Sequence, residues 1–308
     1  MPLIDARSQL AAKIEVTEGA AEVLANTDAV LASNVKFDPD IEVEELDLQS
    51  ASLSPFAAVA GARKARMTFE CPLKGSGAAG TAPEIGKLIK ACGFGETVVV
   101  STSVTYLPGS ASIPSLTIAR YVDGKKYLMA GARGTFEIQL RAGRKPIVAF
   151  DFLGTALADT DEGPLAAVTY QASVAKPFQN GSFTINAYAA IVEAITIATG
   201  NQLDLRPDVN SVQGYKSAVI AKRLMTMKLN PEDVLITTHD FWATWEAGTL
   251  VAFTAAINGG AGNITTITAP KVQYGKVGQG IRGGMLTYEI DAALRRNAGD
   301  DELSIAFT

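Results

Sequence analysis

The sequence has little of the side-chain chemistry on which metal sites and many enzymes depend. Its 308 residues include one histidine, His239, and two cysteines, Cys71 and Cys92, whose spacing is unlike that of metal ligands. Cys71 lies in an alternating apolar run and Cys92 ends an expected helix, so we expect two buried free thiols rather than a disulfide. We expect His239 to be a helix-start or surface residue. The sequence therefore predicts no metal, no cofactor, no catalytic residues and no enzymatic activity.

The glycine-rich and acidic stretches do not complete a catalytic or nucleotide-binding motif. The runs at 75–80 and 275–284 lack the lysine–serine ending of a phosphate-binding loop and do not lie in a strand–loop–helix unit. The carboxylates at 159–162 and 299–303 fall in an expected linker and an expected turn, where a buried pair with shifted pKa values is not expected. A hydrolase with an unrecognised site is the least favoured alternative.

The chain also lacks an excess of basic residues and a long apolar run. Its net charge is −5, whereas stable binding to DNA phosphates usually needs a basic surface. No run approaches the roughly 20 apolar residues that span a bilayer, and the first residues do not resemble a secretion signal. We expect a soluble protein that is made in the cytoplasm, has no membrane anchor and does not hold DNA tightly.

Alternating apolar and polar residues, in a chain that is 47% hydrophobic, predict half-buried strands. The run at 65–73 alternates strictly, 97–107 has the composition of one strand, and 147–152 places every second apolar residue on one face. Asp123 and Gly124 between two such runs are a strong hairpin signal. These patterns favour a mainly β fold.

Two short helices interrupt the strand pattern. Residues 82–93 place their apolar side chains on one face, with Thr81 as the expected cap, Pro83 in the first turn and Gly93 as the stop. A second helix is expected within 239–248, which also ends at a glycine.

An acidic segment at 15–47 contains Lys36 as its single basic residue. Its carboxylates are expected either to be solvated or to meet the basic groups at 63–66, 125–126 and 141–145. Opposite charges on opposite faces would suit head-to-tail stacking of identical subunits.

The second half of the sequence repeats the order of the first half: strands, helix, hairpin, strands. The matched segments are 67–71 with 225–229, the turn at 123–124 with that at 258–259, and 148–152 with 286–290. We therefore expect two copies of one domain, 1–158 and 159–308, joined by a linker at 154–164.

A family resemblance covers most of the chain and rests on an ordered set of motifs rather than on one signature. The first half reads ARMTFECPLKGSGAAGTAPEIGKLIKACGFGETV and then VTYLPGSASIPSLTIARYVDGKKYLMAGARGTFEI; the second reads DFWATWEAGTL, APKVQYG and GDDELSIAFT. This set resembles the major tail tube proteins of long-tailed, siphovirus-like double-stranded DNA bacteriophages.

The resemblance implies two tandem β-sandwich or small-barrel domains, each with a short flanking α-helix. It implies a structural virion protein whose rings stack head to tail into the hollow tail tube through which DNA passes during ejection. Most family members have one domain and form hexameric rings, so a two-domain chain implies homotrimeric, pseudo-hexameric rings, with hexamers as the alternative. The implied partners are other copies of the chain, the tape-measure protein and other tail proteins.

Candidate site residues follow from the strand pattern together with this resemblance. Outward-facing polar residues of the strands are expected to face the lumen: Glu70, Glu137, Gln139, Asp151 and Glu289. A loop and a hairpin tip are expected to contact neighbouring subunits through Lys74, Gly75, Thr81, Asp123, Gly124, Lys125 and Lys126. A mildly acidic lumen would let DNA slide without sticking.

Two other classes of function stay open. A tail terminator, baseplate component or capsid decoration protein would form one ring or a cap rather than a tube. A carbohydrate-binding, adhesin-like β module would need an exposed aromatic platform, for which 7% aromatic residues give little material.

Overall fold

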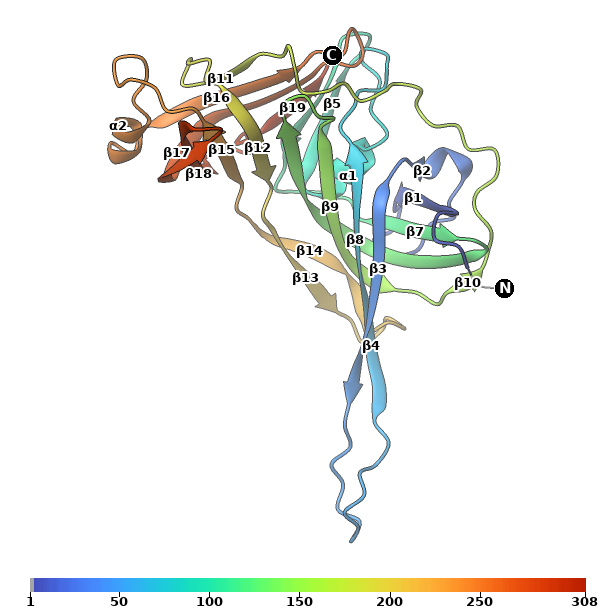
Figure 1. Cartoon of the computed structure of the whole chain (residues 1–308). Helices are drawn as coiled ribbons and strands as arrows, with labels where there is room; N and C mark the ends of the chain where they lie inside the picture. Colours follow the sequence, from blue (N-terminus) through green and yellow to red (C-terminus); the bar gives the residue numbers. More distant parts are fainter. Residues whose placement is uncertain (1–2) are drawn as a thin grey trace.

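The computed structural model describes residues 3–308 and consists mainly of antiparallel strands with a short helix in each half, which confirms the expected fold class (Figure 1). The first half contains β1 (Ser8–Ile14), the 3-10 turn η1 (Asn26–Asp28), β2 (Ala29–Val30), β3 (Ser33–Glu44), β4 (Val59–Pro72), α1 (Gly86–Ala91), β5 (Phe94–Val99), β6 (Ser103–Pro108), β7 (Leu116–Val122), β8 (Lys125–Arg141), β9 (Ile147–Ala156) and β10 (Thr160–Asp161). The second half contains β11 (Phe183–Ile185), β12 (Val192–Ala198), β13 (Asn201–Pro207), β14 (Tyr215–Arg223), β15 (Thr226–Pro231), α2 (Phe241–Glu246), β16 (Leu250–Ile257), β17 (Thr265–Arg282), β18 (Met285–Leu294) and β19 (Ser304–Phe307).

Eight strands form one continuous antiparallel array that crosses both halves. Their order is β3–β4–β9–β8–β12–β15–β18–β17, four strands from each half. The halves meet where β8 pairs with β12, and a second junction pairs β19 with β6. We call this array the central sheet.

One face of the central sheet builds the core. Val148, Phe150 and Phe152 are buried on a single face, as their spacing predicts, and the ring of Phe69 lies 5.6 Å from that of Phe150. Burying side chains of this size contributes about 1.5–3 kcal/mol each. The buried cluster continues into the second half through Ile197 and other residues, so the two halves share one core.

The two helices and the β7–β8 hairpin confirm most of the local predictions. Asp123 and Gly124 both have positive φ, 46° and 103°, which is the conformation that a two-residue hairpin turn requires. Helix α1 is followed by Gly93 with φ +89°. In α2, the carboxylate of Asp240 accepts a hydrogen bond from the Ala243 amide at 2.8 Å and caps the first turn.

Two local predictions are wrong. Thr81 does not cap α1; the helix is entered through a backbone turn in which the Gly86 amide donates to the Pro83 carbonyl at 2.9 Å. The run at 97–107 is not one strand but the hairpin β5–β6, because a turn at Ser101, with φ 55°, reverses the chain.

The hairpin β3–β4 extends far beyond the body of the molecule as an arm (Figure 1). Two acidic residues of this arm meet one base of the same chain, since Lys64 lies 3.2 Å from Asp40 and 3.5 Å from Glu42. The loop that joins β13 and β14, the strands of the separate two-stranded sheet, contacts the arm where the Arg63 amide donates to the Gln213 carbonyl at 2.9 Å.

The connection between the halves is longer than the expected linker and begins later. Residues 154–156 still belong to β9, and the chain then runs from 157 to 182 with only the short β10 before it enters β11. This strap is fixed to the first half by the ammonium group of Lys74, which donates to the carbonyls of Gln171 and Ser173 at 2.8 and 3.0 Å.

Strand pairing follows the same plan in the two halves. The pairs β4–β9 and β9–β8 correspond to β15–β18 and β18–β17, and the short strands β10 and β19 pair with the first parts of β8 and β17. Val148 lies opposite Cys71 as Ile290 lies opposite Leu229. The sequence match of 148–152 with 286–290 is therefore wrong by four residues, and the exposed Leu286 is not the counterpart of the buried Val148.

Candidate functional site

The five residues predicted to face a lumen lie together on the polar face of the central sheet, opposite the core. Glu70 and Glu137 both pair with Ala149, one from each side. Gln139 lies opposite Thr196. Asp151, two residues along from Ala149, has the same orientation, as has Glu289 in the second half. Period-two alternation predicted which way each side chain points, but only the pairing of β8 with β12 brings the two sets to one surface.

The carboxylates of this polar face accept hydrogen bonds from nearby side chains, and one of them is paired with an arginine. Arg66 donates two hydrogen bonds to Asp151, and these bonds raise the pKa of the Arg66 guanidinium. Asn34 donates to Glu70 at 3.0 Å, and Gln139 donates to Glu137 at 2.7 Å.

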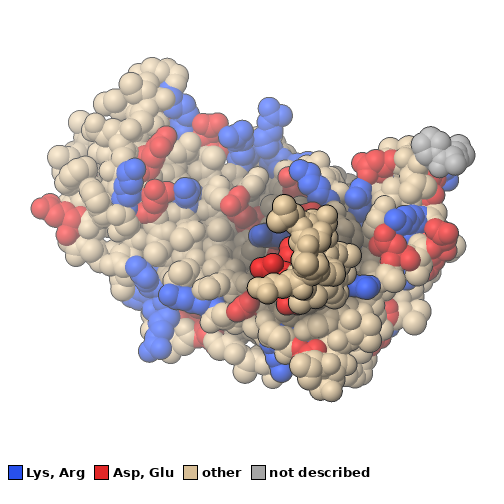
Figure 2. Space-filling model, turned by 90° about the horizontal axis from the view of Figure 1, so that it is seen from below, with Lys and Arg blue, Asp and Glu red and all other residues tan. Residues whose placement is uncertain are grey.

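Basic and acidic residues alternate over this part of the molecule. Lys228 lies 3.5 Å from Asp291 on the polar face. Seen along the arm, Lys and Arg are interspersed with Asp and Glu, without a broad area of one sign (Figure 2). Such a surface neither attracts nor repels a polyanion strongly, because fields of opposite sign cancel within about 10 Å in salt.

The loop residues predicted at subunit contacts make contacts within the chain. Lys74 is buried beneath the strap, and the amide of Gly75 donates to Asn263 Oδ1 of the second half at 2.7 Å. Thr81 is exposed. These bonds show that the loop joins the two halves; its role between subunits stays a prediction.

The tip of the β7–β8 hairpin is also braced from within the chain. Lys125 pairs with Asp159 at 2.7 Å and Lys126 with Glu162 at 2.9 Å. Asp123 accepts from Arg7 at 2.5 Å. Gly124 projects freely, since a Cβ atom there would meet nothing within 4 Å. The contact role of this tip stays a prediction.

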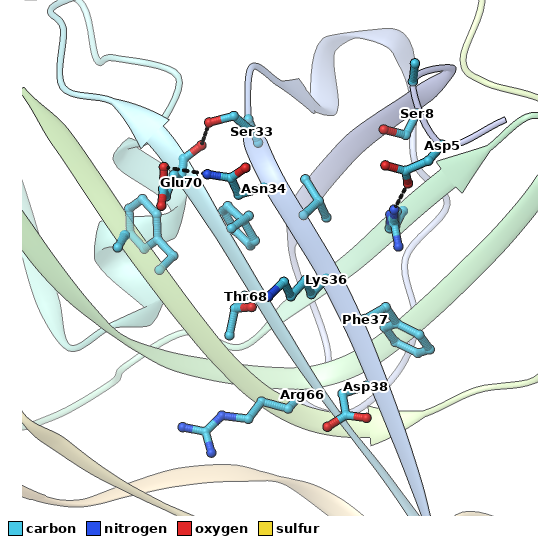
Figure 3. A pocket seen from close by; sticks show the side chains of 17 residues that line it. Asp5, Ser8, Ser33, Asn34, Lys36, Phe37, Asp38, Arg66, Thr68 and Glu70 are labelled. Atoms are coloured by element: carbon cyan, nitrogen blue, oxygen red, sulfur yellow. Dashed lines mark hydrogen bonds and ion pairs between the residues drawn. The ribbon is translucent and has the colours of Figure 1, made fainter. Parts of the chain in front are cut away.

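A hollow of about 1080 Å³ lies around the outer edge of β3 (Figure 3). Within the described residues, β3 pairs only with β4, so its other edge has no partner strand. The hollow is lined by Asp5, Ala6, Ser8, Ala32, Ser33, Asn34, Val35, Lys36, Phe37, Asp38, Arg66, Thr68, Phe69, Glu70, Arg120, Ala149 and Phe150.

The opposite end of the central sheet is open as well. The first part of β17 pairs with β16 and β19, whereas residues 276–282 pair only with β18 among residues 3–308. Sequence reasoning missed both edges. One signal was present in Pro39, which lies within β3 and which strands tolerate mainly at sheet edges.

The titratable groups that sequence analysis singled out are poorly placed for chemistry. Cys71 and Cys92 are free and buried, as expected, and burial raises the pKa of both thiols, which disfavours the reactive thiolate. The His239 ring stacks on Tyr188 at 4.6 Å between centroids, and burial lowers its pKa. Between residues 3 and 308, no group of three His, Cys, Asp or Glu side chains is placed to hold a metal ion. None of the described helices combines the length and apolarity that a membrane crossing needs.

Comparison with known proteins gives one match that spans the fold. A family model described as phage tail tube protein matches residues 5–307. No curated protein matches the chain in a sequence search.

Proposed function

Because the chain belongs to the phage tail tube protein family, we propose that it polymerises as stacked rings into the hollow tail tube of a siphovirus-like phage. In this proposal DNA passes along the tube during ejection without specific binding. The observation that carries it is the central sheet, which has a polar face and two open edges within a chain of this family. Unpaired edges invite pairing with another chain, and pairing around a ring leaves no edge exposed.

Each ring is proposed to contain three chains. The repeated strand pairing supports two tube domains per chain, approximately 1–158 and 159–308, so three chains supply the six domains that the family's hexameric rings contain. A ring of six chains is the alternative. The shared core argues that the two domains act as one rigid unit.

The polar face of the central sheet is proposed to line the lumen. Its mixed charges support passage of DNA, because a strongly basic wall would hold phosphates and a strongly acidic wall would repel them. Further proposed partners are the tape-measure protein and other tail proteins, with assembly in the host cytoplasm and a final location in the virion tail.

Negative-stain electron microscopy of the purified chain, with mass photometry of its rings, tests the proposal. Hollow tubes of stacked rings with three chains per ring are the expected result. Six chains per ring would retain the tube and overturn the trimer. A closed oligomer that never stacks, even at high concentration, would overturn the tube and favour a terminator or decoration protein.

A further inference from the structure

We propose that residues 276–279 of β17 in one copy pair, antiparallel, with residues 33–36 of β3 in the next copy, in the register that β8 and β12 already show within the chain. This inference rests on the proposed function and specifies its subunit interface. The partner is a second copy of this chain. The β8–β12 pairing is the intramolecular counterpart of the same junction.

The β8–β12 junction defines a row of paired residues. Ala149 on β9 lies opposite Glu137 on β8, Glu137 lies opposite Ala198 on β12, and Ala198 lies opposite Thr226 on β15. Beside this row, Ile138 pairs with Ile197, and both side chains are buried. The junction thus joins the hydrophobic cores of the two halves.

Each end of the central sheet carries one half of an equivalent row of paired residues. At one end, Asp291 on β18 lies opposite Lys276 on β17, in the place of Ala149 and Glu137. At the other end, Lys36 on β3 lies opposite Thr68 on β4, in the place of Ala198 and Thr226. If the two ends join in the register of β8 and β12, Lys36 of one copy lies opposite Lys276 of the next copy.

Apolar residues lie beside the lysines where the internal junction has its isoleucines. Val277, which is 5% exposed, corresponds to Ile138. Val35, half-buried and packed against the core, corresponds to Ile197. Pairing the edges in this register therefore continues the apolar layer from one copy to the next.

The limits of the free edges agree with this register. If Lys36 lies opposite Lys276 in an antiparallel pair, Pro39 lies opposite Gln273. Gln273 already pairs with Leu250 of β16. Pro39 cannot donate a ladder hydrogen bond, so it lies just where the pairing must end.

The hollow at β3 is the space that the incoming strands would fill. Within the chain, the turn after β8 forms a bridge between Ala142 and Phe178, ahead of β11. The corresponding position ahead of β1 is occupied by Asp5, which lines the hollow together with Ser33 and Lys36 (Figure 3). The β17–β18 turn of the neighbour would lie there, and it carries the exposed Ile281 and Met285.

Disulfide trapping tests the register. In the double variant Lys36→Cys/Lys276→Cys, mild oxidation of assembled protein should produce dimers and trimers on a non-reducing gel. Directly opposed residues have Cβ atoms about 4.5–5.5 Å apart, close to disulfide geometry. Both lysines are exposed, and Cys71 and Cys92 are buried, so the variant should fold and the native thiols should not compete.

Two matched variants complete the test. Asp40→Cys/Lys276→Cys displaces one thiol by about 13 Å along β3 and should not cross-link. Glu137→Cys/Ala198→Cys should close within the monomer and shows that the internal pair is trappable. If tubes form but Lys36→Cys/Lys276→Cys gives no cross-link between chains, this pairing is overturned while the proposed function stays intact. A cross-link in Asp40→Cys/Lys276→Cys alone would have the same meaning. A chain that stays monomeric at every concentration and never cross-links would overturn both.

Discussion

At the scale of single residues, Arg133 connects the two halves from a nearly buried position. Its guanidinium donates to the carbonyl of Ile113, to the carbonyl of Ala218 on β14 and, at 2.7 Å, to the carboxylate of Glu18. Burial raises the pKa of Glu18, but the hydrogen bonds from Arg133 and Ser217 outweigh it and leave that pKa lowered.

We expect Glu18→Gln to lower the free energy of unfolding by about 2 kcal/mol at neutral pH, because a buried guanidinium loses its counter-charge. The folded-state pKa of Glu18 lies below the ordinary value of 4.5, so its contribution is complete above pH 4.5 and is lost as the pH falls through the lowered value. Urea unfolding at pH 7 and below pH 4.5 measures the difference, which should shrink in acid. Glu45→Gln, at an exposed position, is the control and should change stability little. An equal loss at both pH values would contradict the assignment.

At the scale of elements, the sequence predicted those whose pattern is local. The alternation in β4 and β9 and the Asp123–Gly124 turn are determined within a few residues, so they were found. The arm, the strap and the open edges depend on which strands pair across the chain, and period-two patterns carry no such information. For the same reason the polar-face residues were individually predictable, whereas their common surface was not.

The strap offers a test at this scale. Lys74→Met should release it, since the carbonyls of Gln171 and Ser173 lose their buried donor, at a cost of about 2 kcal/mol. Limited proteolysis should then cut within 157–182 faster than in the wild type while the sheet residues stay protected. Lys176→Met, on the strap itself, is the matched control. Unchanged cleavage in Lys74→Met would show that other contacts hold the strap.

At the scale of the whole molecule, the shared core and the paired junctions make the two halves one cooperative body. We expect calorimetry of the unassembled chain to show a single unfolding transition, with the van't Hoff enthalpy equal to the calorimetric enthalpy. Ile197→Asp, which places a charge in the β8–β12 junction, should uncouple the halves and split or broaden that transition. The exposed-site change Thr226→Asp serves as control. Two transitions in the wild type would contradict a shared core.

The two halves differ in one feature that a ring would display on a large scale. The hairpin β5–β6 has no counterpart in the second half, where only residues 247–249 separate α2 from β16. In a ring of three chains, this hairpin recurs every 120° rather than every 60°. The tube surface would therefore have threefold rather than sixfold symmetry at the position of this hairpin. Successive rings would then have three equivalent docking orientations instead of six.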